Sequence, residues 1–460
     1  MHLLGHEVVP MPKLRKSGWD WILLSFLLLS SLWVLIPKRL QAQQAEIPPP
    51  SENPLAEDSA QAERVVSGRP PLYHVKRIAN PIWWFQTGIR PLVGLAGKFG
   101  TESGGPKEEK TPSTSGIKFG VRGHGPSSGF GPEIKPFDKN LFNTGIEVEV
   151  PLSVTYKLYE SFRFRVNFPL ISHEATEPPG HEATEVLGLE LTGGYASRPS
   201  DSFFGIGNDT PLSNESRFRT VSRTTGLALD VRPAKSLSFR VGSSFRSIGV
   251  TQPRDFRSVT DVFQPQDVPG LMTGATMFVS TASIQRDTTD HPHMPASGGL
   301  QRVEFSLNEG VRGGDFSYYR YRADLQQFLP LTEDRRAVIA LRAGLETNQP
   351  KGGSKVPFFD LPYIGSSSTV RGFMTRRFSD RSVMTASAEY RYRIWQYLDL
   401  GLFADAGQVA PEIANFAMDR LHTGYGARFY VRSHKRRGFI LDIARSPEQW
   451  AVYLDFSPLF

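Results

Sequence analysis

The chain has 460 residues with 39% hydrophobic and 22% charged side chains, an ordinary balance that excludes a disordered acidic or basic tail. The net charge is +7, but no basic run is interleaved with aromatic residues, so we expect no binding to nucleic acid. Cysteine is absent, which excludes disulfides and thiolate metal sites and suits passage through an oxidising periplasm.

Residues 1–42 resemble an export signal peptide. An uncharged apolar run at 21–36 follows the basic cluster KLRK at 13–16. A run this short after a basic region is typical of a secretory signal rather than of a spanning helix. We expect cleavage after Ala42. An uncleaved anchor is the alternative, because Lys38 and Arg39 stand between the apolar run and that point.

Residues 43–112 are expected to form a periplasmic tether. Its beginning is rich in proline and acidic residues, and its end, SGGPKEEKTPSTSG from 103, is polar and rich in glycine. Between these parts lies a short apolar segment around Trp83, Trp84 and Phe85. This segment would either touch the membrane or the mouth of the next domain, or pack against that domain.

From residue 113 onward, apolar and polar side chains alternate. VMTASAEYRYRI (383–394), YRYRADLQQF (319–328) and FRFRVNF (162–168) each place apolar side chains on one face and charged or polar ones on the other. Such alternation indicates strands. A β-sandwich also alternates, but these runs are near ten residues, and nothing else in the chain could cover so many apolar faces. The sequence therefore predicts an all-β fold, a closed transmembrane antiparallel barrel with lipid outside and a wet lumen inside.

We expect about sixteen strands over residues 113–460, eleven before residue 348 and five after residue 381. An even number is typical of bacterial single-chain barrels. Short links such as RPAK (232–235) predict periplasmic turns. The long links predict extracellular loops at 248–272, 348–381 and 409–421. Residues 170–185 break this rule, because they form a long link on the side of the short turns.

The last expected strand, 450–460, ends on an aromatic residue. Its apolar face consists of Trp450, Val452, Leu454, Phe456 and Phe460. A final strand of this kind is the signal that barrel-assembly machinery recognises. The alternative is a terminal strand that ends in phenylalanine by chance.

The longest expected loop contains LPYIGSSSTVRGFMTRRF (361–378) and precedes strands with AEYRY (388–392) and FADAG (403–407). The tetrad Val370, Arg371, Gly372 and Phe373 in this setting resembles the outer-membrane-protein assembly factor superfamily. That group includes BamA, TamA, two-partner secretion translocators and the bacterial surface antigen family. SSGFGPEI (127–134), DSFFGIGNDT (201–210) and IQRDTTDHPHMPASGG (284–299) also look similar, so the resemblance covers about 113–460.

The resemblance implies that the loop folds back into the lumen and that carboxylates of the two following strands hold Arg371. Alternation independently points Glu389 and Asp405 inward. A guanidinium inside a narrow lumen needs paired carboxylates, and its fork suits them. Gly372 would permit a tight turn and Phe373 would pack against the wall. A solvated external loop is the alternative, since a short motif is only a hypothesis.

The resemblance also implies a function at the bacterial outer membrane, reached by export through the periplasm. Family members usually carry periplasmic repeat domains that receive clients, but residues 43–112 show no such pattern, which puts an insertase role in doubt. Three hypotheses therefore stay open: insertion or translocation of proteins, a lipid- or solute-handling pore, and a structural surface-antigen barrel. The expected partners are outer-membrane lipid, and periplasmic assembly proteins or client outer-membrane proteins.

We expect no enzymatic activity, no cofactor and no metal site. GPSSG (125–129) matches a nucleophile elbow, but no helix follows Ser127 as that motif requires. His291 and His293 lie in an expected turn without a third ligand, which favours a polar turn over a metal site.

Overall fold

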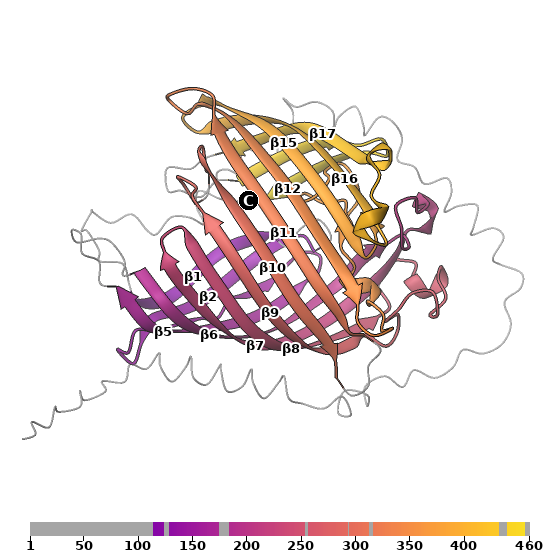
Figure 1. The fold of residues 1–460 in the computed structure, drawn as a ribbon, viewed down its shortest axis with the longest axis horizontal. Coiled ribbons are helices and arrows are strands. Elements are labelled where there is room, and N and C mark those ends of the chain that lie inside the picture. The colour runs from indigo at the N-terminus through magenta and orange to yellow at the C-terminus, as the bar shows by residue number, and fades with distance from the viewer. Residues whose placement is uncertain are drawn as a thin grey trace, which may run out of the picture. The chain divides into compact units, whose positions relative to one another are not determined.

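The computed structural model describes residues 114–123, 128–173, 184–253, 256–292, 294–311, 316–431 and 439–455. The signal and tether segments and the last five residues, with Phe456 and Phe460, lie outside this part. Most of the described residues belong to one antiparallel sheet (Figure 1). Its strands are β1 (Ser115–Gly123), β2 (Phe130–Leu141), β3 (Ile146–Glu149), β4 (Leu152–Val154), β5 (Glu160–His173), β6 (Thr184–Phe203), β7 (Ser216–Ala234), β8 (Leu237–Thr251), β9 (Ala275–Asp287), β10 (Gly298–Gly310), β11 (Tyr318–Pro330), β12 (Ala337–Pro350), β15 (Ser382–Trp395), β16 (Leu398–Ala410), β17 (His422–Val431), β18 (Phe439–Arg445) and β19 (Trp450–Asp455).

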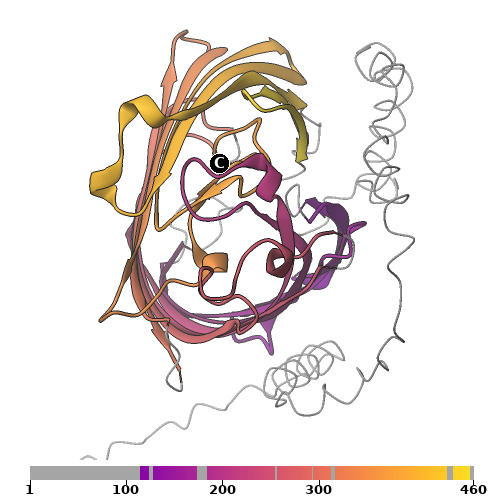
Figure 2. The ribbon, with the colours of Figure 1, turned by 90° about the vertical axis from the view of Figure 1, so that its right-hand side faces the viewer.

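These strands occupy sixteen positions in the barrel, because β3 and β4 both lie between β2 and β5. The break falls at Val150 and Pro151, where proline has no N–H to give to a ladder. Each of the remaining strands of this sheet pairs only with the strands that precede and follow it. The sheet is therefore an up-and-down meander that curls into a barrel (Figure 2). The prediction of an all-β barrel with about sixteen strands is confirmed.

The two ends of the barrel differ in their connections. One, the long-loop end, carries the links at 204–215, 252–274, 351–381, 411–421 and 446–449. These links contain the 3-10 helices η4 (Leu212–Asn214), η5 (Val259–Asp261), η6 (Phe358–Asp360), η7 (Ile413–Asn415) and η8 (Met418–Arg420). The other, the short-turn end, includes the two-residue links at 235–236 and 396–397. Within the described residues, no helix is long and apolar enough to cross a membrane.

Alternate residues of each strand face opposite sides of the wall. On β16, Leu402 is 55% exposed, whereas Phe403 and Asp405 are 4% and 3% exposed. Exposed large apolar residues recur on the outer face of the other strands, at Leu227, Leu325 and Leu341 among others. A contiguous apolar surface of this kind is expected against lipid and not against water.

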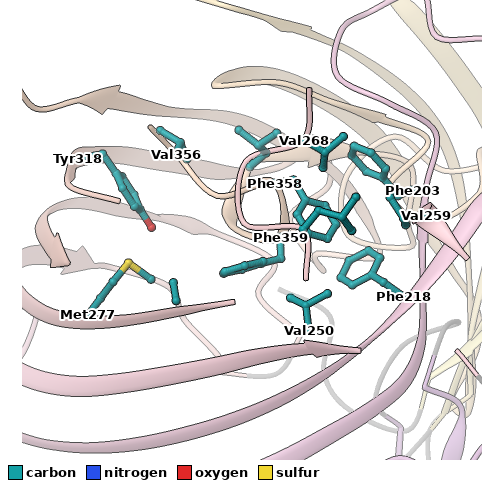
Figure 3. Close-up of a cluster of buried hydrophobic side chains, with 13 residues drawn as sticks. Phe203, Phe218, Val250, Val259, Val268, Met277, Tyr318, Val356, Phe358 and Phe359 are labelled. Carbon is teal, nitrogen blue, oxygen red and sulfur yellow. The ribbon is translucent and has the colours of Figure 1, made fainter. Parts of the chain in front are cut away.

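The long-loop half of the interior holds a hydrophobic cluster (Figure 3). Phe203 and Phe218 from the wall meet Phe358 of η6 edge to face, with ring centroids 5.1 and 4.7 Å apart. Val259 of η5 is fully buried in the same cluster. Aromatic packing of this type stabilises beyond the area that it buries. The longest loop is therefore folded into the barrel.

The sheet's first and last strands approach each other at Gly123 of β1 and Asp455 of β19. A Cβ atom at position 123 would lie 3.7 Å from Asp455 Oδ1. Within the described residues, the backbone ladders run in sequence from β1 to β19, and none joins these two strands.

Candidate functional site

The site is the part of the 351–381 loop that carries Val370, Arg371, Gly372 and Phe373. A two-stranded sheet, β13 (Tyr363–Ile364) with β14 (Phe378–Ser379), closes the loop at its base. All four motif residues are buried inside the barrel, and Val370 and Phe373 belong to one small hydrophobic cluster. The alternative of a solvated external loop is excluded, because these four residues are buried.

Arg371 lies against Asp405 of β16 in a two-pronged ion pair. Its Nε donates to Asp405 Oδ2 at 2.6 Å and its Nη2 donates to Oδ1 at 2.7 Å. The backbone N–H of Arg371 reaches Oδ2 as well, at 3.1 Å. Ser387 of β15 donates to Oδ1 at 2.7 Å, and the guanidinium lies 3.3 Å from the ring centroid of Phe403. One carboxylate thus fixes both the side chain and the backbone of the motif.

Glu389 of β15 is near Arg371 but does not hydrogen-bond to it. Its Oε2 lies 3.7 Å from Arg371 Nη1. Glu389 is held instead by the Tyr430 hydroxyl, which donates to Oε1 at 2.5 Å, and its Oε2 lies 3.5 Å from Arg428 Nη1. The structure therefore brings both expected carboxylates to the site, one in direct contact and one behind it.

Sequence reasoning missed the rest of this charge cluster. Arg428 of β17 forms its own two-pronged pair with Asp442 of β18, at 2.6 and 2.7 Å, and Asp442 Oδ2 lies 3.9 Å from Arg371 Nη1. Two arginines and three carboxylates are thus buried together. Alternation in ARFYV (427–431) and LDIAR (441–445) points Arg428 and Asp442 inward, and this signal could have found them.

The motif also contacts the last strand. The Gly372 N–H donates to the Tyr453 hydroxyl of β19 at 3.1 Å, and that hydroxyl donates to the Phe373 carbonyl at 3.2 Å. Gly372 has a φ of 94°, and a Cβ there would lie 2.7 Å from Ser446 N, so only glycine fits this turn. Of the expected outer face of β19, Trp450, Val452 and Leu454 are exposed.

A glycine in the wall makes room for the motif. A Cβ at Gly424 of β17 would lie 2.0 Å from the Arg371 carbonyl oxygen. We therefore expect Gly424→Ala to displace the loop and to cost about 1–3 kcal/mol of stability, as overpacking does. Trypsin should then cleave after Arg371 or Arg376, which are buried in the native protein. Gly120→Ala is the control, because its Cβ meets nothing within 4 Å. Equal protease resistance of both variants would contradict this packing.

Further contacts hold the loop across the long-loop mouth. Arg377 donates to Glu448, in the β18–β19 link, at 2.9 Å and to the Thr210 carbonyl, in the β6–β7 link, at 2.8 Å. Asp360 of η6 accepts from Arg246 of β8 at 3.0 Å and from Tyr318 of β11 at 2.8 Å. The loop is therefore attached to several parts of the wall.

The family follows from comparison with known proteins. Residues 140–433 match the Omp85 superfamily domain, which is more than half of the chain. The chain belongs to the Omp85 superfamily. This confirms the resemblance seen in the sequence. No periplasmic repeat domain is evident in the part of this Omp85 chain that the structure describes.

The relatives fit this assignment. The outer membrane protein assembly factor BamA of Nitratidesulfovibrio vulgaris is 27% identical over 201 residues, which are 39% of this chain and 25% of that protein. This chain thus matches about a quarter of that relative's length. Among solved structures, BamA from Haemophilus ducreyi lacking POTRA domains 1–3 is 15% identical with a TM-score of 0.54, covering 75% of this chain and 69% of that one. CdiB from Escherichia coli is 11% identical with a TM-score of 0.50, covering 75% and 62%. These two structures share the fold.

Omp85 barrels are outer-membrane proteins and are generally non-enzymatic insertion or transport proteins. Ser127 and His293 lie outside the described residues. His291 Nδ1 accepts a hydrogen bond from the Met294 N–H at 3.1 Å. In the described ranges, no group of three or more His, Cys, Asp or Glu side chains is arranged to hold a metal ion.

Proposed function

We propose that this Omp85 barrel takes part in the insertion or translocation of proteins at the bacterial outer membrane. The observation that carries the proposal is the position of the motif. Arg371 is anchored to β16 through Asp405, and the next two residues are hydrogen-bonded to Tyr453 of β19. The loop thus braces the wall from β15 to β19 from inside, at the side of the barrel where the chain's last strand lies.

A seam between β1 and β19 that opens sideways toward lipid is the mechanism we propose. An open strand edge exposes unpaired N–H and C=O groups, which can pair with an incoming strand. The buried charge cluster would keep β16, β17 and β18 in register while the edge of β19 moves. Tyr453 connects this rigid part to the moving strand, so its two hydrogen bonds would respond to opening.

The remaining parts of the chain have supporting roles in this proposal. Residues 1–42 direct export through the periplasm, and residues 43–112 tether the barrel on the periplasmic side. The long-loop end then faces outward and the short-turn end faces the periplasm. The partners are outer-membrane lipid, and client outer-membrane proteins or periplasmic assembly proteins.

Reconstitution tests the proposal. The purified barrel in lipid vesicles should accelerate the folding of a urea-unfolded outer-membrane β-barrel protein, measured as the fraction with heat-modifiable gel migration. Vesicles that contain an unrelated barrel are the control. A selective single-channel conductance with no effect on the client would instead support the solute pore. An inactive barrel without conductance would leave the structural surface-antigen hypothesis.

A further inference from the structure

The outer face of β7 changes its chemistry along the strand. Near the short-turn end its outward side chains are apolar, and Leu227 and Leu229 are 49% and 38% exposed. The same face of the same strand then carries Arg223, Arg219 and Arg217 toward the long-loop end. We call these three residues the outward arginine row. Arginine is rare where a barrel faces lipid, because at the bilayer midplane it costs about 2–4 kcal/mol.

The neighbouring residues of β7 show that the side chains of the row point outward. The β7–β8 ladder is regular from Arg219 to Val231, so odd-numbered residues share one face. Phe218, between two of the arginines, is 1% exposed and packs on Phe358 inside the barrel. Since Phe218 points inward, Arg217 and Arg219 point outward.

The row is rich in positive charge that the protein does not neutralise. Arg217 pairs with Glu215 at 3.2 Å, and Arg219 Nη2 donates to the uncharged Ser197 hydroxyl at 3.1 Å. Within the described residues, Arg223 has neither an ion pair nor a hydrogen bond from its side chain. The Nε atoms of all three arginines are buried without an acceptor.

Two further groups belong to the surroundings of the row. Lys157, in the β4–β5 turn, is close enough that burial and the charge of Arg217 lower the pKa of its ammonium group. Glu160 begins β5 opposite Ser197 and is the second carboxylate nearby, besides Glu215. Arg257, which donates to the Glu215 carbonyl oxygen at 2.8 Å, is a further cation beside Arg217, so cations outnumber carboxylates around the row.

The position of the row across the membrane matches that of the lipid head groups. Arg223 lies eight residues from the outward Val231, or about 26 Å along the strand at the usual rise, which a strand tilt of about 35–45° reduces to about 20 Å of height. The apolar band of such barrels is about 25 Å tall, so an apolar face that starts at Val231 ends near Arg223. Tyr195 of β6 pairs in register with Arg223, as in the aromatic girdle at that border. Arginine stems can lie along the apolar surface while their guanidinium groups reach the polar layer.

We propose that the outward arginine row binds the phosphate groups of a phosphorylated lipid in the leaflet at the long-loop end. The guanidinium fork matches phosphate oxygens, and the exposed leucines below it receive the acyl chains. A lipid is favoured over a soluble anion because the cations border an apolar surface. The inference goes beyond protein insertion and rests on the proposed outer-membrane orientation, which makes this the outer leaflet.

Lipid A, which carries phosphate on a glycolipid, is the probe. The purified full chain in detergent should bind fluorescent lipid A, and Arg219→Ala/Arg223→Ala should weaken binding about tenfold or more, since hydrogen bonds to charged groups are strong. Arg286→Ala is the matched control. It removes an outward arginine of β9 at the short-turn end, where Arg286 is in register with Leu237 and Gln301, and should bind as wild type.

Two further measurements distinguish binding of a phosphorylated lipid from binding of a soluble phosphate. Dephosphorylated lipid A should bind about as weakly as the double variant, and millimolar inorganic phosphate should not displace the lipid. Equal binding by the double variant, equal binding of dephosphorylated lipid A, or displacement by phosphate would each overturn the inference. Heat-modifiable migration verifies folding, and Arg223→Ala alone carries the test if the double variant does not fold. Client insertion is not measured here, so failure of this inference is distinct from failure of the proposed function.

Discussion

Arg371→Ala is expected to lower the free energy of unfolding by about 3–5 kcal/mol, because removing one partner of a buried ion pair leaves the other charge uncompensated. The side chain of Asp405 is fully buried, and Glu389 and Asp442 add two more negative charges within 4 Å of the arginine. Arg428 alone would then face three carboxylates. Urea unfolding in detergent, followed by heat-modifiable migration, measures the loss.

The control for this prediction is Arg302→Ala. Arg302 also pairs with a carboxylate, Glu304 at 2.7 Å, but its side chain is 44% exposed. An exposed pair is worth about 0–1 kcal/mol, so this variant should remain near wild type. Arg371→Ala/Asp405→Ala should cost less than the sum of the two single variants, because the two residues act as a unit. Additive losses, or a stable Arg371→Ala protein with normal activity, would show that the motif is not an anchor.

The barrel could be predicted from the sequence because alternation is a local property. Each strand carries its own two-residue period, so the count of sixteen positions needed no knowledge of tertiary contacts. The break between β3 and β4 was not foreseen, since one proline inside a run does not tell whether the strand continues. The cluster around Phe203, Phe218 and Phe358 was missed for another reason. It joins strand ends to loop residues, and loops have no period to read.

The site could also be predicted in part. Alternation along β15 and β16 predicts that Glu389 and Asp405 face inward, and both lie at the motif. Alternation alone cannot tell which of the two carboxylates contacts Arg371, because the distance to Arg371 depends on the path of the loop. Asp442 and Tyr453 come from strands about seventy to eighty residues after the motif, and only the curvature of the sheet brings them to Arg371 and Gly372. The outward arginine row obeys alternation but departs from the rule that outward side chains of a barrel are apolar, as functional sites often depart from such rules.

A disulfide across the seam is expected to abolish client insertion. Gly123→Cys and Asp455→Cys would place two thiols where β1 and β19 approach, since a Cβ at 123 lies 3.7 Å from Asp455 Oδ1. A disulfide needs Cβ atoms about 3.5–4.5 Å apart, which small shifts at these strand ends can provide. The chain contains no other cysteine, so the bridge formed is defined. Oxidised protein should fold the client no faster than empty vesicles, and a reductant should restore the rate.

The matched control clamps two strands that the mechanism keeps together. Ala427 of β17 and Ile443 of β18 are register partners, and cysteines at these positions would bridge a ladder that does not open. This second bridge should leave client folding unchanged, and the single variants Gly123→Cys and Asp455→Cys should remain active in both redox states. If the oxidised seam bridge has no effect, lateral opening between β1 and β19 is wrong, because a covalent bond would then span a gap that clients still use.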